Sequence, residues 1–495
     1  MITDLRTPQA AVSWLHARVT GTLHADSRNV QPGDGFLAWP GAVQDARQHV
    51  AGALQTGANA CLVESSGIEK YEFSSEKIAA YTNLKSAAAQ IAAGYFGEPS
   101  KQLQTVGITG TNGKTSTAWW LAHALGKVNR RCAMVGTLGI GAPESLVPNG
   151  LTTPDPVLLQ QQLRRFVNEG FSACAIEASS IGLAEHRLDA VRFQVAVFTN
   201  FTQDHLDYHG SMPRYWAAKA ALFEWPGLQS QVINVDDAQG LKLSAMLEAG
   251  GLDLWTYSVN SSARLRAESI QQNASHLVFD VVEGNQRRTV TTTAVGLYNV
   301  SNLLGVIGAM RALGLPFDDV VHACCDLPAV PGRLNTLDEP GVPLVVVDYA
   351  HTPDALEKVL TALRPLAASR GGQLWCVFGC AGDRDAAKRP LMAAMAQRNS
   401  DYVVVTSDNP RSEDPARIVD QILLGLQQLE SVHVQIDRAL AIDQTIARAQ
   451  PEDVVLLAGK GHEDYQEIHG VKFPFEDQRH ARAALNARLI AGASS

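Results

Sequence analysis

Short apolar runs alternate with longer stretches in which apolar residues recur every three to four positions. In the middle of the chain, strand-like runs cover Thr105–Thr109, Ala173–Ile176 and Val195–Phe198, and a helical pattern over Thr115–Leu125 follows the first of them. This alternation is typical of parallel strands joined by crossover helices. The pattern therefore predicts an α/β fold.

Two breaks interrupt the pattern. The helical pattern Ala87–Phe96 ends at Gly97-Glu98-Pro99, because proline cannot continue a helix, and a second break falls at Val330-Pro331-Gly332-Arg333. The alternation then resumes, which predicts a doubly wound, Rossmann-like C-terminal sheet. Its expected strands are Leu344–Asp348, Leu374–Phe378, Tyr402–Thr406 and Val454–Ala458, with a helix over Pro353–Leu363. We expect three domains, at residues 1–99, 100–335 and 336–495.

Composition narrows the possible functions. A chain of 495 residues accommodates about three domains. The formal net charge is −9 and no Lys/Arg-rich run occurs, which argues against nucleic acid as a partner. No apolar run approaches the ~20 residues of a membrane span, so no membrane insertion is expected. The start of the chain lacks a signal-peptide pattern and the seven cysteines are scattered, which favours a cytoplasmic protein with reduced thiols, expected to be a monomer.

The strongest local motif is Val106-Gly-Ile-Thr-Gly-Thr-Asn-Gly-Lys-Thr115, which follows an apolar strand and opens a helix. Backbone N–H groups of such a loop surround phosphate oxygens, Lys114 reaches the β/γ-phosphates and the Thr115 hydroxyl binds Mg²⁺. Ile108 stands where the usual pattern has glycine. A glycine-rich turn without a ligand is the alternative, but the strand, the Lys-Thr pair and the helix favour phosphate. The expected ATP contacts here are Gly110, Thr111, Asn112, Gly113, Lys114, Thr115 and Ser116.

Taken together, several segments resemble the Mur ligases and their folylpolyglutamate synthase relatives. In chain order they are Thr109–Thr115, Glu177-Ala-Ser-Ser180, Thr199-Asn-Phe-Thr-Gln-Asp-His-Leu-Asp207, Asn299-Val-Ser-Asn302, Pro331-Gly-Arg333 and Asp348-Tyr-Ala-His-Thr352. The resemblance spans nearly the whole chain. It implies an N-terminal domain for the UDP end of the substrate, a central P-loop ATPase domain and a C-terminal domain that closes over the reaction.

The resemblance implies a catalytic set with ATP as co-substrate and two Mg²⁺ ions. It comprises Lys114, with Thr115, Glu177, His205 and a carbamate on Lys219 as metal ligands. Alternatives remain for three of them: a helix-capping carboxylate at Glu177, a turn histidine at His205 and a solvated helix lysine at Lys219.

Other positions are assigned to ATP and to the UDP-N-acetylmuramoyl-dipeptide. The ATP contacts are Asn299, Asn302, Arg333 and Asp348, which could equally be helix-capping, linker and strand-end residues. The dipeptide contacts are Ser27, Thr152, Thr153, Ser179 and Arg187; Ser27 could equally be a turn serine, and Arg187 a surface salt-bridge residue. Two features depart from the family: Glu185 stands where glutamine is common, and the loop 39–49 lacks the usual D-G-H pattern.

The segment Asp408-Asn-Pro-Arg411 resembles the motif of the diaminopimelate-adding members of the family. Diaminopimelate carries a carboxylate that lysine lacks, and a guanidinium binds carboxylate with charge-assisted hydrogen bonds. Asn409 is expected to offer its amide carbonyl to the neighbouring ammonium. The expected diaminopimelate contacts are Arg389, Asp408, Asn409, Arg411, Gly459 and Glu463. Asn-Pro and Gly461 could also be simple turn formers.

The implied reaction is phosphorylation by ATP of the D-glutamate γ-carboxylate of the muramoyl-dipeptide, followed by attack of a diaminopimelate amine. A lysine-adding ligase is disfavoured by Arg411. A folylpolyglutamate synthase-like enzyme is disfavoured by Asp26-Ser27-Arg28, which resembles a uridine-contacting segment. A non-catalytic nucleotide-binding regulator would not need Glu177, His205 and Lys219.

Overall fold

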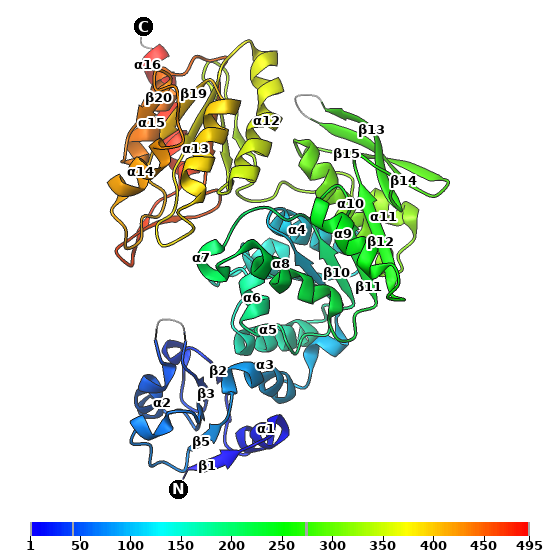
Figure 1. Ribbon diagram of the computed structural model, residues 1–495, viewed down its shortest axis with the longest axis vertical. Helices are drawn as coiled ribbons and strands as arrows, with labels where there is room; N and C mark the ends of the chain where they lie inside the picture. The colour runs from blue at the N-terminus through cyan, green and yellow to red at the C-terminus, as the bar shows by residue number, and fades with distance from the viewer. Residues whose placement is uncertain (1, 42–43, 273–275, 494–495) are drawn as a thin grey trace.

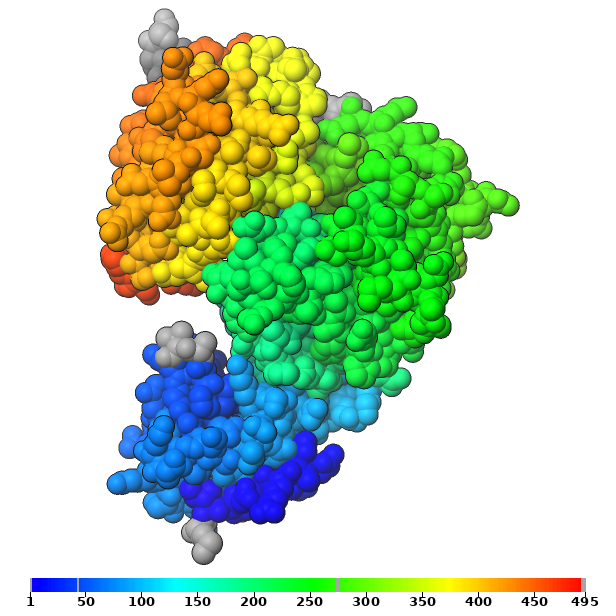
Figure 2. Space-filling view, in the orientation of Figure 1, coloured from blue at the N-terminus to red at the C-terminus, as the bar shows by residue number. Residues whose placement is uncertain are grey.

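The computed structural model describes residues 2–41, 44–272 and 276–493, and it is built from three bodies in chain order along one axis (Figure 1). Within these ranges the chain forms three main sheets and a small hairpin. The N-terminal body lies at one end, the central body in the middle and the C-terminal body at the other end. In the space-filling view the surface is indented between the two outer bodies (Figure 2).

The N-terminal sheet is parallel, with the order β1-β5-β4-β3-β2. Its strands are β1 (Thr3–Leu5), β2 (Leu23–His24), β3 (Gly35–Ala38), β4 (Ala60–Glu64) and β5 (Ile78–Tyr81). Its helices are α1 (Pro8–His16), α2 (Val50–Thr56) and α3 (Leu84–Tyr95). Alternate residues of β4 face opposite sides: Leu62 packs with α1 and α3, whereas Val63 packs with α2. This alternation buries both faces of the sheet.

The central sheet has the order β15-β14-β13-β12-β11-β10-β6-β9-β7-β8. Its strands are β6 (Gln104–Thr109), β7 (Cys132–Gly136), β8 (Gly139–Gly141), β9 (Ala173–Glu177), β10 (Val195–Phe198), β11 (Ser230–Asn234), β12 (Asp253–Ser258), β13 (Leu265–Gln272), β14 (Leu277–Glu283) and β15 (Gln286–Thr292). Strands β6 and β9 to β12 pair in parallel. The sequence pattern predicted this pairing for β6, β9 and β10, but it did not predict β11 and β12. Strands β13–β15 form an antiparallel extension that was not predicted from the sequence.

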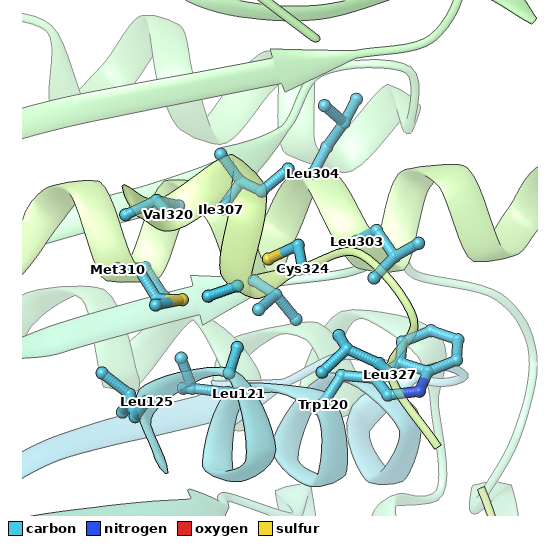
Figure 3. Packing of buried hydrophobic residues seen from close by; sticks show 14 of the residues in the cluster. Trp120, Leu121, Leu125, Leu303, Leu304, Ile307, Met310, Val320, Cys324 and Leu327 are labelled. Atoms are coloured by element: carbon cyan, nitrogen blue, oxygen red, sulfur yellow. The ribbon is translucent and has the colours of Figure 1, made fainter. Parts of the chain in front are cut away.

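The helices of the central body cover both faces of this sheet. They are α4 (Lys114–Lys127), α5 (Pro156–Asn168), α6 (Ser180–Ala184), α7 (Leu206–His209), α8 (Met212–Ala220), α9 (Ala238–Leu247), α10 (Leu297–Ala312) and α11 (Phe317–Ala323). Trp120 and Leu121 of α4 belong to one buried cluster with Leu303 and Ile307 of α10, and Figure 3 shows Cys324 between Leu121 and Ile307. Burying side chains of this kind stabilises the fold by about 1.5–3 kcal/mol each, so α4 and α10 are held together as one unit.

The C-terminal sheet has the order β16-β17-β21-β18-β19-β20. Its strands are β16 (Asn335–Leu337), β17 (Leu344–Asp348), β18 (Leu374–Phe378), β19 (Tyr402–Val405), β20 (Val432–Val434) and β21 (Val454–Ala458), and β22 (Tyr465–Ile468) and β23 (Val471–Pro474) form the hairpin. Its helices are α12 (Pro353–Arg370), α13 (Lys388–Asn399), α14 (Pro415–Leu423), α15 (Arg438–Arg448) and α16 (Asp477–Ala493). Strands β17 to β21 are parallel and helices pack on both faces, which confirms the doubly wound prediction.

No helix in the described part of the chain is both long and apolar enough to span a bilayer.

Candidate active site

The central and C-terminal bodies share a cavity of about 1560 Å³ at the carboxyl ends of their parallel strands. This is where open α/β sheets place their ligands. The expected site residues that line it are Thr111, Asn112, Gly113, Lys114, Thr115, Ser116, Thr152, Thr153, Glu177, Ser179, Arg187, His205, Lys219, Asn299, Asn302, Arg333, Asp348, Asp408, Asn409, Arg411, Gly459 and Glu463. Gly110, Ser27 and Arg389 do not line it.

The phosphate loop connects the end of β6 to the start of α4. Gly110 has a φ of 147°, and a Cβ there would lie 1.9 Å from Thr199 Oγ1, so the backbone demands glycine. Gly113 has a φ of 85°, and a Cβ would lie 2.4 Å from Asn302 Oδ1. Lys114 Nζ donates to the carbonyls of Gly110 and Thr111 at 2.9 and 2.8 Å. Burial lowers the pKa of Lys114, while the nearby Glu177 opposes that shift.

Side-chain oxygen atoms of Thr115 and Glu177 lie together beside the phosphate loop. The Glu177 carboxylate has no exposed surface and accepts hydrogen bonds from Thr115 Oγ1 at 3.0 Å and from the Thr137 backbone N–H at 2.9 Å. Burial raises its pKa, and the Lys114 charge opposes the rise. The helix-capping alternative for Glu177 is wrong, because the residue that caps α6 is Ser179, whose Oγ accepts from the Gly182 N–H at 3.0 Å.

Lys219 is buried, with 1% of its surface exposed, so the alternative of a solvated helix lysine is wrong. Its Nζ donates to the Gly110 carbonyl at 2.7 Å and lies 4.6 Å from the centre of the Tyr215 ring. Burial, with the Lys114 charge as a second cause, lowers the pKa of Lys219 well below its ordinary value. A neutral amine beside the phosphate loop is the form that reacts with CO₂.

His205 begins α7 in a left-handed conformation, with a φ of 53°. Its Nε2 lies 3.4 Å from Asp204 Oδ2, and burial lowers the pKa of His205 to about 3. Asp204, which was not predicted as a site residue, accepts a hydrogen bond from Lys388 Nζ of the C-terminal body at 3.3 Å. Burial opposes ionisation of Asp204, but the charges of Lys388, His205 and His351 together outweigh it and hold its pKa well below the ordinary range. This ion pair joins the two bodies across the cavity.

Further contacts fix the C-terminal body against the phosphate loop. Asn112 Nδ2 donates to Asp354 Oδ2 at 2.8 Å, and Arg333 Nη2 to Thr115 Oγ1 at 3.3 Å. Asp348 is buried and accepts from the backbone N–H groups of Leu334 and Ala350, both at 2.8 Å, so it holds the connection between the bodies. Burial raises the pKa of Asp348, and the Arg333 charge opposes that shift.

Asn299 and Asn302 stand side by side on the first turns of α10. Asn302 Nδ2 donates to Asn299 Oδ1 at 3.1 Å, and Asn299 Nδ2 donates to the Val295 carbonyl at 2.7 Å. Because α10 packs on α4, this pair is fixed next to Gly113 of the phosphate loop.

The expected dipeptide contacts form a hydrogen-bonded group next to the expected metal ligand Glu177. Thr152 Oγ1 lies 3.0 Å from Thr137 Oγ1, and Thr153 Oγ1 donates to the Glu177 carbonyl at 2.7 Å. Arg187 Nη1 donates to the Thr153 carbonyl at 2.8 Å. Among the described residues Arg187 has no ion-pair partner, which argues against the surface salt-bridge alternative.

Glu185 and Ser27 lie near the junction of the N-terminal and central bodies, and neither lines the main cavity. Glu185 pairs with Lys85 of α3 at 2.5 Å and accepts a hydrogen bond from Tyr208. Ser27 belongs to a short 3₁₀ turn that Asp26 caps, away from the main cavity. The loop 39–49 includes residues 42–43, which lie outside the described residues.

The C-terminal loops place Asn409, Arg411 and Glu463 around one end of the cavity. Gly459 has a φ of 112°, and a Cβ there would lie 2.6 Å from Asp408 Oδ2, which explains the glycine. Arg411 Nη1 donates to the Gly382 carbonyl at 2.8 Å, and its Nε lies 3.4 Å from Glu467 Oε2. The guanidinium keeps further N–H groups for a carboxylate.

Two expectations about these loops need correction. The Asn409 carbonyl does not face a ligand, because it accepts from Lys460 Nζ at 3.1 Å and from the Glu467 backbone N–H at 2.9 Å. Asn409 therefore offers an amide N–H instead. Arg389 is 1% exposed and donates to Glu413 at 2.8 and 2.9 Å and to Gln421 at 2.6 Å, so it supports the loop from beneath the cavity wall.

Comparison with known proteins agrees with this geometry. The sequence matches the Mur ligase middle domain over residues 108–310 and the Mur ligase, glutamate ligase domain over residues 332–461. The chain belongs to the Mur ligase family. A UDP-N-acetylmuramoyl-L-alanyl-D-glutamate–2,6-diaminopimelate ligase from Acidovorax sp. (strain JS42) is 57% identical over 98% of both chains. The protein of the same name from Pseudomonas aeruginosa is 47% identical over 94% of this chain and 95% of its own.

Solved structures share the same three-body architecture. The structure of a UDP-N-acetylmuramoyl-L-alanyl-D-glutamate–2,6-diaminopimelate ligase is 34% identical, with a TM-score of 0.64 over 94% of this chain and 95% of that one. A MurF ligase from Thermotoga maritima in complex with ADP has a TM-score of 0.70 at 19% identity, covering 95% and 99% of the two chains, and so shows the fold alone.

Proposed function

We propose that this chain is an ATP-dependent ligase of peptidoglycan synthesis that adds meso-diaminopimelate to the D-glutamate γ-carboxylate of UDP-N-acetylmuramoyl-L-alanyl-D-glutamate. The observation that carries the proposal is the single cavity that joins the phosphate loop to the loop Asp408–Arg411. Such an enzyme first phosphorylates one substrate and then brings an amine to the phosphorylated intermediate. The phosphate loop and the amino-acid loop must therefore open into one enclosed site.

The chemistry follows in two balanced steps. The γ-carboxylate oxygen attacks the γ-phosphorus of ATP, which gives an acyl phosphate and ADP. The diaminopimelate amine then attacks the acyl carbon, and the tetrahedral adduct loses phosphate and a proton to leave an amide. Lys114 stabilises charge on the phosphoryl oxygens, and Arg333 reaches the same place from the connection between the central and C-terminal bodies. The interbody contacts of Asp204 and Asn112 keep water from the acyl phosphate.

The residues beside the loop fit Mg²⁺. Thr115 and Glu177 offer a hydroxyl and a carboxylate, the hard oxygen donors that Mg²⁺ binds together with substrate phosphates. We assign a second ion to His205 and a Lys219 carbamate, whose buried amine is chemically ready for CO₂. No group of three His, Cys, Asp or Glu side chains suited to a metal occurs in the described part of the chain, in keeping with sites completed by phosphate oxygens. The bound ions would neutralise phosphate charge.

Recognition of the two remaining substrates is divided between the bodies. Arg187, Thr152 and Ser179 line the cavity where the muramoyl-dipeptide is expected, with Ser27 near its UDP end in the N-terminal body. Arg411 and the free Asn409 N–H suit the carboxylate of diaminopimelate, and Glu463 suits the ammonium beside it. We further propose the boundaries 1–99, 100–335 and 336–495 for the three domains, although β16 begins at Asn335. We also propose that the protein is a monomer, that it acts in the cytoplasm and that it does not bind nucleic acid.

The test is product identification. The purified protein is incubated with ATP, Mg²⁺, the muramoyl-dipeptide nucleotide and diaminopimelate, and the nucleotide products are identified by mass spectrometry. The proposal predicts a tripeptide nucleotide that requires every component. Formation of a product from folate and glutamate, or of none with diaminopimelate, would overturn it.

A further inference from the structure

Lys460 is a completely buried lysine in the loop that follows β21. Its side chain has no exposed surface, although it lies between two glycines at the edge of the cavity. A buried ammonium is costly unless it is paired and hydrogen-bonded. Lys460 Nζ donates to Glu463 Oε2 at 3.0 Å and to Asn409 Oδ1 at 3.1 Å. It therefore ties the loop after β21 to the loop after β19.

These bonds decide which atoms remain for a ligand. In the described part of the chain, the hydrogen bonds of the Glu463 side chain all use Oε2, which also accepts from Asn409 Nδ2 at 2.8 Å. The Asn409 carbonyl is taken by Lys460 and by the Glu467 N–H. Glu463 Oε1 and the second N–H of Asn409 remain open, and both residues line the cavity. One is an acceptor for an ammonium and the other a donor for a carboxylate.

The charge on Glu463 depends on this lysine. Burial and the neighbouring Asp408 raise the pKa of Glu463, and Lys460 opposes both. The other ionisable groups that face Glu463 are Arg438, Tyr349 and Tyr465. A protonated Glu463 would present a neutral carboxyl group to the substrate ammonium and lose the ionic part of the contact.

We propose that Lys460 is a positioning residue of the amino-acid site, which orients the Asn409 amide and keeps Glu463 ionised with one oxygen open for the diaminopimelate ammonium. This inference rests on the proposed function, because it deepens the account of the same site. It gives a substrate-selecting role to a residue that touches no substrate itself.

Lys460→Met tests the proposal by steady-state kinetics with each substrate varied in turn. The KM for diaminopimelate should rise at least about tenfold at neutral pH, whereas the KM values for ATP and the dipeptide nucleotide stay within about twofold. Without the lysine the pKa of Glu463 rises further, so the part of the affinity that depends on the Glu463 charge should return as pH increases and Glu463 ionises. The matched control is Lys242→Met, which removes an exposed lysine from α9, outside the cavity lining, and should change none of these values.

Two further variants keep the test decisive. Lys460→Gln retains bulk and a donor to Asn409, so it carries the measurement if Lys460→Met does not fold. Adding Glu463→Gln to Lys460→Gln should cost no more than Glu463→Gln alone, since Lys460→Gln keeps the donor to Asn409 and so affects diaminopimelate through Glu463. An unchanged KM for diaminopimelate, an equal loss for all substrates, or additive effects in the double variant would overturn the inference. If the wild-type protein does not use diaminopimelate at all, the proposed function itself fails.

Discussion

Lys219 Nζ donates a hydrogen bond to the carbonyl of Gly110 at 2.7 Å, inside the central body and next to the phosphate loop. Among the described residues no carboxylate lies within ion-pair distance of this amine, which is unusual for a lysine with 1% exposure. An ordinary lysine has a pKa of about 10.4, so only a small fraction is neutral at pH 7. Burial removes that barrier to reaction with CO₂, and the resulting carbamate anion would suit a metal ion.

We expect Lys219→Ala to be nearly inactive, because the ligand that the carbamate would provide is missing. A short carboxylic acid such as acetate or formate should restore part of the activity by occupying the vacated space. The measurement is phosphate release with and without the acid, with Lys242→Ala on α9 as a control lysine. Full activity of Lys219→Ala without any added acid would contradict the role.

Lys114→Ala should abolish ligation while the thermal unfolding midpoint stays close to that of the wild type. Among the described residues, the side chain of Lys114 donates its hydrogen bonds to carbonyls of its own loop, so its removal should delete a phosphate ligand rather than a packing contact. Lys127→Ala, at the other end of α4, is the control and should remain active. Turnover like that of the wild type in Lys114→Ala would show that phosphate is bound elsewhere.

Arg411→Ala should impair use of diaminopimelate specifically. Loss of a charge-assisted bond to a carboxylate costs roughly 1.5–3 kcal/mol, which is about a tenfold or greater fall in the specificity constant. ATP and the dipeptide nucleotide should be affected much less, because their expected contacts lie on other loops. The measurement is the specificity constant for each substrate from steady-state kinetics, with Arg417→Ala, which removes an exposed arginine, as the control. An unchanged specificity constant for diaminopimelate would move the recognising group away from Arg411.

The C-terminal sheet depends on a buried ion pair that the sequence analysis missed. Arg438 donates to Asp477 at 2.6 and 2.7 Å, and to the carbonyls of Ser407 and Ala458, which precede the two loops of the amino-acid site. Arg438→Met should lower the free energy of unfolding by about 3–5 kcal/mol, because Asp477 is left charged and buried. Urea denaturation measures this, and Arg438→Met combined with Asp477→Leu should recover much of the loss.

The sequence predicted the elements best where local pattern and local chemistry agree. Strands β17, β18 and β21 have the expected bounds, because apolar runs bounded by turn residues leave little choice. Helix α12 extends through Pro365 to Arg370, beyond the expected end at Leu363, since one missing N–H at an exposed position is tolerated. The antiparallel strands β13–β15 escaped notice because their alternation of polar and apolar residues is weak.

Several features of the site depend on contacts between segments far apart in the chain, which local sequence patterns do not predict. The burial of Lys219 and Lys460 depends on segments far away in the chain. From the neighbouring sequence alone, both would be taken for ordinary surface lysines. The orientation of the Asn409 amide depends on Lys460 and on the Glu467 backbone, which no motif encodes. The ion pair between Asp204 and Lys388 exists only when two bodies meet. The family resemblance therefore located the site, whereas the burial and hydrogen-bond partners of its side chains follow from the packing of the folded chain.

The central claim is that this enzyme joins diaminopimelate to the muramoyl-dipeptide nucleotide, and the most direct test is phosphate release with a panel of amino acids. The wild-type protein is given ATP, Mg²⁺ and the dipeptide nucleotide, with diaminopimelate, lysine or glutamate as the amine. We predict release that depends on diaminopimelate, with a specificity constant at least about tenfold above that for lysine. Equal release with lysine, or release with glutamate alone, would contradict the account.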